Sequence, residues 1–162
     1  MLNISSVKNK DNEVILKGSD ICKYHTNPNS NYIVFNPQNF QQVAPIEMYR
    51  APEKLLYRFI SSQLVFAYDD KQTLSLNSCN LVIPKLEGLH IKYILAILNS
   101  RIAQFIYKME FHSVKVLRSH IENIPIPDVN AGMQNSIIQA VEPLINGLPP
   151  EGAQIAYEQL DF

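Results

Sequence analysis

The chain has 162 residues, of which 46% are hydrophobic and 18% are charged, and its formal net charge is -1. This size and composition exclude a disordered chain and fit one folded domain with a substantial core. No apolar run approaches the ~20 residues of a membrane-spanning helix, and the N-terminus lacks the basic-then-apolar pattern of a signal peptide. Cys22 and Cys79 are too few for a disulfide framework. We therefore expect a cytoplasmic protein with two buried thiols and no membrane partner.

The first half of the chain predicts short strands separated by loops. A turn at residues 18–20 offers Ser19 as the N-cap of a brief helix that reaches Tyr24. The aromatic-rich segment 53–60 favours a strand with a helical entry. Strands are expected over residues 13–17, 32–35, 53–60 and 63–68, with a Pro-bounded polar loop at 36–45.

The second half changes from strand to helix periodicity at Gly88. Residues 69–72 predict a hairpin turn, and residues 73–83 a strand interrupted near Asn77 and Ser78. Apolar residues at helical spacing over 89–109 predict two helices with a break at Asn99 and Ser100. Further along we expect an extended segment at 124–127, an amphipathic helix at 133–145 and a short helix at 155–160.

Strands before helices, without alternation of the two, predict an α+β fold. We expect a twisted, mainly antiparallel sheet with helices packed beside it, followed by a C-terminal amphipathic helix. The predicted division is a polar N-terminal extension at 1–12, a main domain at 13–127 and an acidic helical segment at 128–162 that packs on it.

The motifs of a catalytic centre are missing from this sequence. A methyltransferase needs a Gly-rich cofactor turn and an Asn-Pro-Pro-aromatic motif, and the nearest text, from Phe35 to Gln38, lacks the second Pro and the aromatic. No His pairs with Cys or another His at metal-ligand spacing. Two enzymatic alternatives remain: the acidic pair Asp69 and Asp70, read here as a solvated turn, and a base–nucleophile pair of His112 or His120 with Ser113.

Charge is distributed unevenly along the chain. Residues 1–49 are balanced, residues 50–118 hold ten Lys and Arg against five acidic residues, and residues 119–162 hold six acidic residues and no Lys or Arg. A basic middle and an acidic end predict one surface that faces a polyanion and one that faces away. The alternative is that these charges are scattered and merely solvated.

DNA recognition needs Lys and Arg for phosphates and small polar or amide side chains for base edges. Three segments carry them: 36–50, the turn 69–72 together with the break at 77–80, and 108–118. The cationic candidates are Arg58, Lys71, Lys85, Arg101, Lys108, Lys115 and Arg118; the polar candidates are Asn77, Asn80, His112 and Ser113.

Several segments in order resemble the TaqI-like C-terminal specificity domain of adenine-specific DNA methyltransferases and of fused type II restriction-modification enzymes. They are VILKGSDICKYH, LLYRFISSQLVFAYDD, NLVIPK, YILAILNSRIAQFIY and VKVLRSHIENIPIP. The last, with the helix after it, is also similar to type I restriction specificity subunits. The resemblance covers about residues 13–146.

This resemblance implies a non-catalytic domain that follows a methyltransferase domain in one polypeptide. The two would clamp double-stranded DNA, and this domain would select the target while the other flips and methylates an adenine. S-adenosylmethionine would belong to that other domain, so no cofactor and no metal are expected in this chain. The alternative is an oligomerisation or protein-docking module that uses helices 89–109 and 133–146, including as a homodimer.

Overall fold

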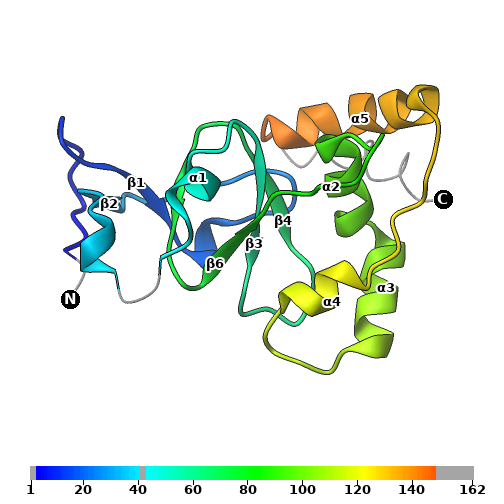
Figure 1. Cartoon of the computed structure of the whole chain (residues 1–162), viewed down its shortest axis with the longest axis horizontal. Helices are drawn as coiled ribbons and strands as arrows, with labels where there is room; N and C mark the ends of the chain where they lie inside the picture. Colours follow the sequence, from blue (N-terminus) through cyan, green and yellow to red (C-terminus); the bar gives the residue numbers. More distant parts are fainter. Residues whose placement is uncertain (1–2, 41–42, 149–162) are drawn as a thin grey trace.

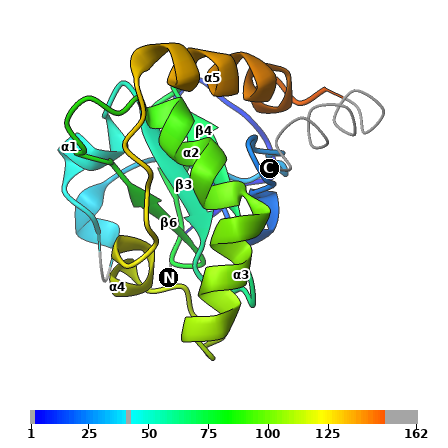
Figure 2. The ribbon, with the colours of Figure 1, turned by 90° about the vertical axis from the view of Figure 1, so that its right-hand side faces the viewer.

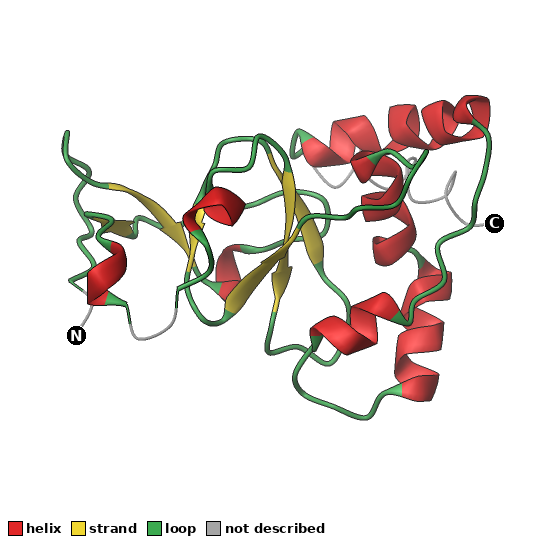
Figure 3. Cartoon of the chain, viewed as in Figure 1, coloured by secondary structure: helices red, strands yellow, loops and turns green. Residues whose placement is uncertain are grey.

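The computed structural model describes residues 3–40 and 43–148, and they form an elongated molecule (Figure 1). A small sheet lies at one end, a second sheet in the centre and most of the helices at the other end (Figure 3). The strands of these residues are β1 (Glu13–Leu16), β2 (Tyr32–Ile33), β3 (Lys54–Arg58), β4 (Phe66–Asp69), β5 (Leu74–Ser75) and β6 (Cys79–Val82). The helices are α1 (Ile46–Tyr49), α2 (Ile91–Asn99), α3 (Arg101–Glu110), α4 (Arg118–Glu122) and α5 (Ala131–Ile145), with short 3-10 helices η1 (Gly18–Asp20) and η2 (Pro37–Asn39).

The terminal sheet has the order β2-β1-β5. β1 pairs antiparallel with β2 and parallel with β5, where Ile15 lies opposite Leu74. Ile15, Ile33, Tyr49 and Leu74 form its buried cluster. Gly18 follows β1 and approaches the β5–β6 turn so closely that a Cβ on it would lie 2.5 Å from the carbonyl oxygen of Ser78.

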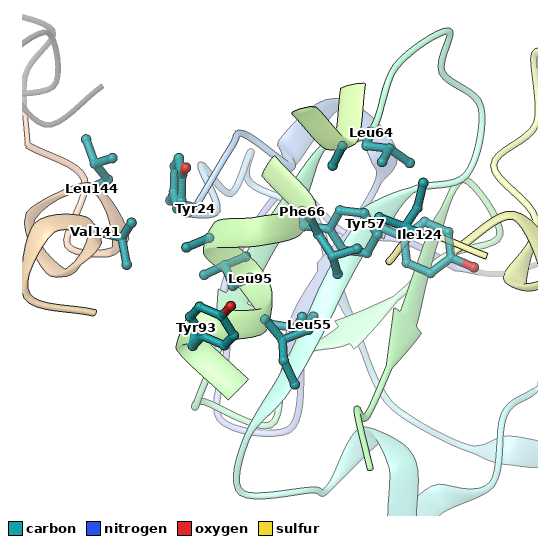
Figure 4. Packing of buried hydrophobic residues seen from close by; sticks show 14 of the residues in the cluster. Tyr24, Leu55, Tyr57, Leu64, Phe66, Tyr93, Leu95, Ile124, Val141 and Leu144 are labelled. Carbon is teal, nitrogen blue, oxygen red and sulfur yellow. The ribbon is translucent and has the colours of Figure 1, made fainter. Parts of the chain in front are cut away.

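The central sheet has the order β4-β3-β6 and is antiparallel throughout. Because side chains alternate along a strand, β3 serves two cores. Leu55 and Tyr57 point into the main core with the helices, and Leu56 packs in a second cluster with Leu16 from β1. Figure 4 shows Leu55 near the helical side chains Tyr93 and Leu95, and Tyr57 next to Phe66 and Ile124.

Two carboxamide side chains attach the helices to the outer edge of β4 and to the residues just before it. Asn99, 2% exposed, accepts from the N–H of Phe66 at 3.0 Å and donates to its carbonyl at 2.9 Å. Gln104 makes the equivalent pair with the backbone of Leu64, at 2.9 and 3.0 Å. Between them Ser100 ends α2 and begins α3 as an N-cap that accepts from the N–H of Ala103. These side chains therefore supply the edge with hydrogen bonds that a further strand would otherwise make.

The last described helix, α5, lies across α2 (Figure 2). Its residues Val141 and Leu144 join the main core. The buried amide of Gln134 fixes the entry to α2, because it accepts from the N–H of His90 and donates to the carbonyls of Gly88 and Val129.

The structure confirms the α+β class and the helix break at Asn99 and Ser100, and it corrects several details. There are two small sheets in the described residues rather than one, and β1 and β5 are parallel. The predicted hairpin at 69–72 is wrong, because β4 and β5 belong to different sheets.

The brief helix after β1 ends at Asp20 and is preceded by Lys17 at its N-cap position, not by Ser19. Cys79 is buried but Cys22 is partly exposed, and the predicted helix at 155–160 lies outside the described residues.

Asp69 is also not the solvated turn residue that its sequence context predicts. Its carboxylate accepts from Lys54 Nζ at 2.6 Å, and the two side chains are only 4% and 0% exposed. Lys54 Nζ also donates to the carbonyl of Tyr49, and the N–H and hydroxyl of Thr73 donate to Asp69. Burial would raise the pKa of Asp69, but the bonds from Lys54 and Thr73 outweigh it and hold the pKa below its usual value.

Candidate nucleic-acid interface

The end of α3, the connection after it and the first residue of α4 carry a group of polar and cationic side chains, here called the basic loop surface. Its exposed members are Lys108, His112, Lys115 and Arg118, and Ser113 is partly buried. The loop is fixed to the central sheet by backbone pairing. The N–H of Ser61 donates to the carbonyl of Val114 at 2.9 Å, and the N–H of Val116 donates to that of Phe59 at 2.7 Å. The side chain of Val116 is 1% exposed. The loop thus presents side chains from a rigid scaffold.

Lys115 and Arg118 project from this scaffold into solvent. Lys115 Nζ lies 6.0 Å from the ring centroid of Phe59. Arg118 Nε donates to Glu122 at 2.6 Å, with side chains 85% and 58% exposed, and this bond raises the pKa of Arg118. An exposed pair one helical turn apart contributes little to stability, so Arg118 can exchange Glu122 for a phosphate at low cost.

Ser113 of this surface and the nearby His120 have local structural partners. The hydroxyl of Ser113 donates to the carbonyl of Lys115 and accepts from its N–H. His120 Nδ1 accepts from the N–H of Leu117, and its ring stacks on Phe111 with a centroid distance of 4.2 Å. Ser113 therefore forms a turn, and its described hydrogen bonds do not join it to a histidine base as the enzymatic alternative requires.

The turn between β5 and β6 lies next to the basic loop surface. Phe59 connects the two, because its N–H donates to Ser78 while its carbonyl accepts from Val116. Asn77 in this turn is exposed, and Asn80 donates to the hydroxyl of Tyr57 at 3.5 Å. Burial raises the pKa of Tyr57, while the bond from Asn80 and the charge of Arg118 act in the opposite direction. Asn77 and Asn80 therefore lie at the same end of the central sheet as Arg118.

Arg58 is placed differently, although it ends β3 at the same end of the sheet. Its side chain is partly buried, and its Nε donates to the carbonyl of Ile21 at 2.8 Å. Arg58 thus ties β3 to the segment after η1, which gives it a structural partner.

Lys71 and Lys85 lie at the opposite end of the central sheet. They follow β4 and β6, whose last residues Asp69 and Val82 pair with the first residues of β3. Both lysines are exposed. The structure therefore separates these two candidates from the basic loop surface.

The outer face of α3 combines cations with a row of apolar side chains. Ile102, Phe105 and Met109 are 59%, 64% and 66% exposed. Arg101 and Lys108 are seven residues apart, hence on one edge of the same face, and both are exposed. Lys23, which the sequence did not single out, lies where this edge begins, because its Nζ donates to the carbonyl of Asn99 at 3.2 Å. Burial lowers the pKa of Lys23, and the charges of Lys108 and Arg101 lower it further.

Within residues 3–40 and 43–148, no group of His, Cys, Asp and Glu has an arrangement that could hold a metal ion. No helix of the same residues has both the length and the apolar character needed to cross a bilayer.

A surface-exposed basic loop on a small α+β scaffold is typical of domains that contact nucleic acid. In agreement, the family model of the TaqI-like C-terminal specificity domain matches residues 13–126. The match covers most of the chain, which therefore belongs to this family and is a DNA-binding target-recognition domain of the restriction-modification type. No curated protein matched the chain.

Proposed function

We propose that this domain selects the target sequence of an adenine-specific DNA methyltransferase and has no catalytic role of its own. The observation that carries the proposal is the basic loop surface, where Lys115 on the loop and Lys108 and Arg118 on the helices that flank it are exposed, and the loop is held to residues 59–61 after β3. Phosphate contacts from such cations fix the position of a protein on the duplex, and polar side chains beside them read base edges.

In this mechanism the domain forms one side of a clamp around double-stranded DNA. Lys108, Lys115 and Arg118 would bind phosphates, while His112 on the same surface and Asn77 and Asn80 beside it would read base edges. The methyltransferase domain of the same polypeptide forms the other side, binds S-adenosylmethionine and extrudes the adenine. We place the protein in the cytoplasm, because its proposed substrate is intracellular DNA.

The proposal is tested by a double substitution, Lys115→Gln with Arg118→Gln, in the intact protein. Loss of two phosphate contacts should weaken binding to every duplex and reduce the slope of log affinity against log salt by about 2. Lys10→Gln is the matched control, because Lys10 is an exposed lysine of the N-terminal extension. An unchanged slope in the double variant would remove these residues from the interface.

A protein-docking role is the second candidate, and the exposed row Ile102, Phe105 and Met109 favours it. This row would bury its apolar area against a second copy of the chain or the methyltransferase domain. Sedimentation of the isolated chain, wild type against Phe105→Ser, separates the two roles. A dimer that the substitution dissociates, together with no DNA binding, would support the docking role.

A further inference from the structure

The short helix η2 forms the tip of a loop that packs on the terminal sheet. Phe35 and Phe40 flank η2, and their rings meet edge to face at a centroid distance of 5.5 Å. Both rings pack against the buried cluster of the terminal sheet. The tip is a closed turn, because Asn36 accepts from the N–H of Gln38 with its side chain and from the N–H of Asn39 with its carbonyl. The loop therefore presents its tip from a fixed base.

The side chains at this tip are amides without charge. Gln38 and Asn39 are both exposed, and residues 34–46 contain five Asn or Gln and no Lys, Arg, Asp or Glu. A neutral amide releases no counterion from a phosphate, whereas its carbonyl and its NH2 group match N6 and N7 of adenine as a pair of hydrogen bonds. The tip is therefore suited to base edges rather than to the phosphate backbone.

η2 and the basic loop surface lie on the same face of the elongated molecule. In Figure 1 both η2 and α4 lie along the lower side, toward opposite ends of the long axis, and in Figure 2, at right angles, both lie toward the left. The turn that carries Asn77 lies between them, because β5 belongs to the terminal sheet and β6 to the central sheet. A duplex laid along this face would therefore pass the basic loop surface, the β5–β6 turn and then η2.

We propose that Gln38 and Asn39 read base edges in a second part of the target, separated along the duplex from the bases read beside the basic loop surface. This inference rests on the proposed function and adds that the target is read toward both ends of the molecule. At least one of the two amides pairs with an adenine. Their loss relaxes one part of the target and leaves the phosphate contacts in place.

The test uses the intact protein and four single variants: Gln38→Ala and Asn39→Ala at the tip, Asn77→Ala at the β5–β6 turn, and Gln139→Ala as the matched control. Gln139 is an exposed amide of α5, which lies along the upper side in Figure 1. Each protein selects from a library of duplexes whose randomised segment is longer than the molecule, and the bound fraction is sequenced. Fluorescence anisotropy gives the salt slope of binding, and urea unfolding shows that each variant is folded.

We expect Gln38→Ala or Asn39→Ala to lower the preference for one A·T base pair, toward one end of the target, by about tenfold. The salt slope should stay at the wild-type value, because no charge is removed. Asn77→Ala should relax a different position of the target, and Gln139→Ala should select the wild-type sequence.

The possible failures are distinct. If both tip variants select the same sequence as wild type, the inference is wrong and the proposed function stands. If the tip variants weaken binding to every sequence alike, η2 contacts the DNA backbone and reads no base, which also overturns the inference. A wild-type protein that enriches no sequence would refute the proposed function and, with it, the assignment of Gln38 and Asn39.

Discussion

The buried pair of Lys54 and Asp69 allows a quantitative prediction about stability. Asp69→Asn removes the counter-charge of an ammonium group that is 0% exposed. Breaking one partner of a buried ion pair costs about 3–5 kcal/mol, because the other charge is left uncompensated. A domain of this size is stabilised by about 5–15 kcal/mol in total, so the substitution should remove a large part of its free energy of unfolding.

The double variant Lys54→Met with Asp69→Leu should cost less than the two single substitutions together. It removes both charges, and the remaining loss comes from the carbonyl of Tyr49 and the donors of Thr73, about 1 kcal/mol for each lost hydrogen bond. A double-mutant cycle should therefore give a coupling free energy of at least about 2 kcal/mol.

Urea unfolding followed by circular dichroism measures these free energies. Asp70→Asn is the matched control, because Asp70 is the next residue in the chain and is exposed; its effect should stay within about 0.5 kcal/mol. The reasoning would be refuted if Asp69→Asn and Asp70→Asn unfolded at the same urea concentration, since burial is what distinguishes the two carboxylates.

Three further predictions concern the same scaffold. Asn99→Leu should cost about 1–3 kcal/mol in urea unfolding, because the N–H of Phe66 loses its partner at the edge of β4. Gly18→Ala should lower the free energy of unfolding by about 1–3 kcal/mol, and with it the urea midpoint, because the new Cβ would collide with the carbonyl of Ser78. The pKa of Asp69 is depressed in the folded state. Its contribution to the free energy of unfolding is therefore complete above the unfolded pKa of about 3.9 and is lost as pH falls through the folded pKa. Asp69→Asn should flatten this dependence of stability on acid pH.

Two exposed side chains provide the controls for these substitutions. Asn77→Leu changes an amide that lies in the exposed β5–β6 turn, and Ser19→Ala changes an exposed neighbour of Gly18. If Asn77→Leu destabilised the domain as much as Asn99→Leu, the edge pairing of Asn99 would not explain the loss. Equal midpoints for Ser19→Ala and Gly18→Ala would contradict the close approach to Ser78.

Local features of the fold could be predicted from the sequence because their causes are local. Ser100 caps α3 with its own hydroxyl, and apolar spacing identifies the helices on both sides. The two-sheet arrangement could not be predicted, because β5 pairs with β1 across almost sixty residues and no pattern specifies such a partner. The burial of Asp69 was missed for the same reason, since its counter-charge on Lys54 lies on another strand.

Only some residues of the candidate site could be found from the sequence. The basic loop surface could be found from sequence because its cations lie within eleven consecutive positions, from Lys108 to Arg118. Lys23 could not be found, because it lies in a separate segment that the fold brings to Asn99. Arg58 has the charge of a DNA contact, and only the structure reveals that its guanidinium is bonded to the backbone of Ile21.

The most direct test of the central claim is to determine which DNA sequences the domain selects. The intact protein is incubated with a library of duplexes that share a randomised central segment, and the bound fraction is sequenced. We predict enrichment of one short sequence, and a change of that sequence when residues 13–126 are replaced by those of another member of the family. DNA that binds but has the same composition as the starting library would contradict the account, because the domain would then hold DNA without reading it.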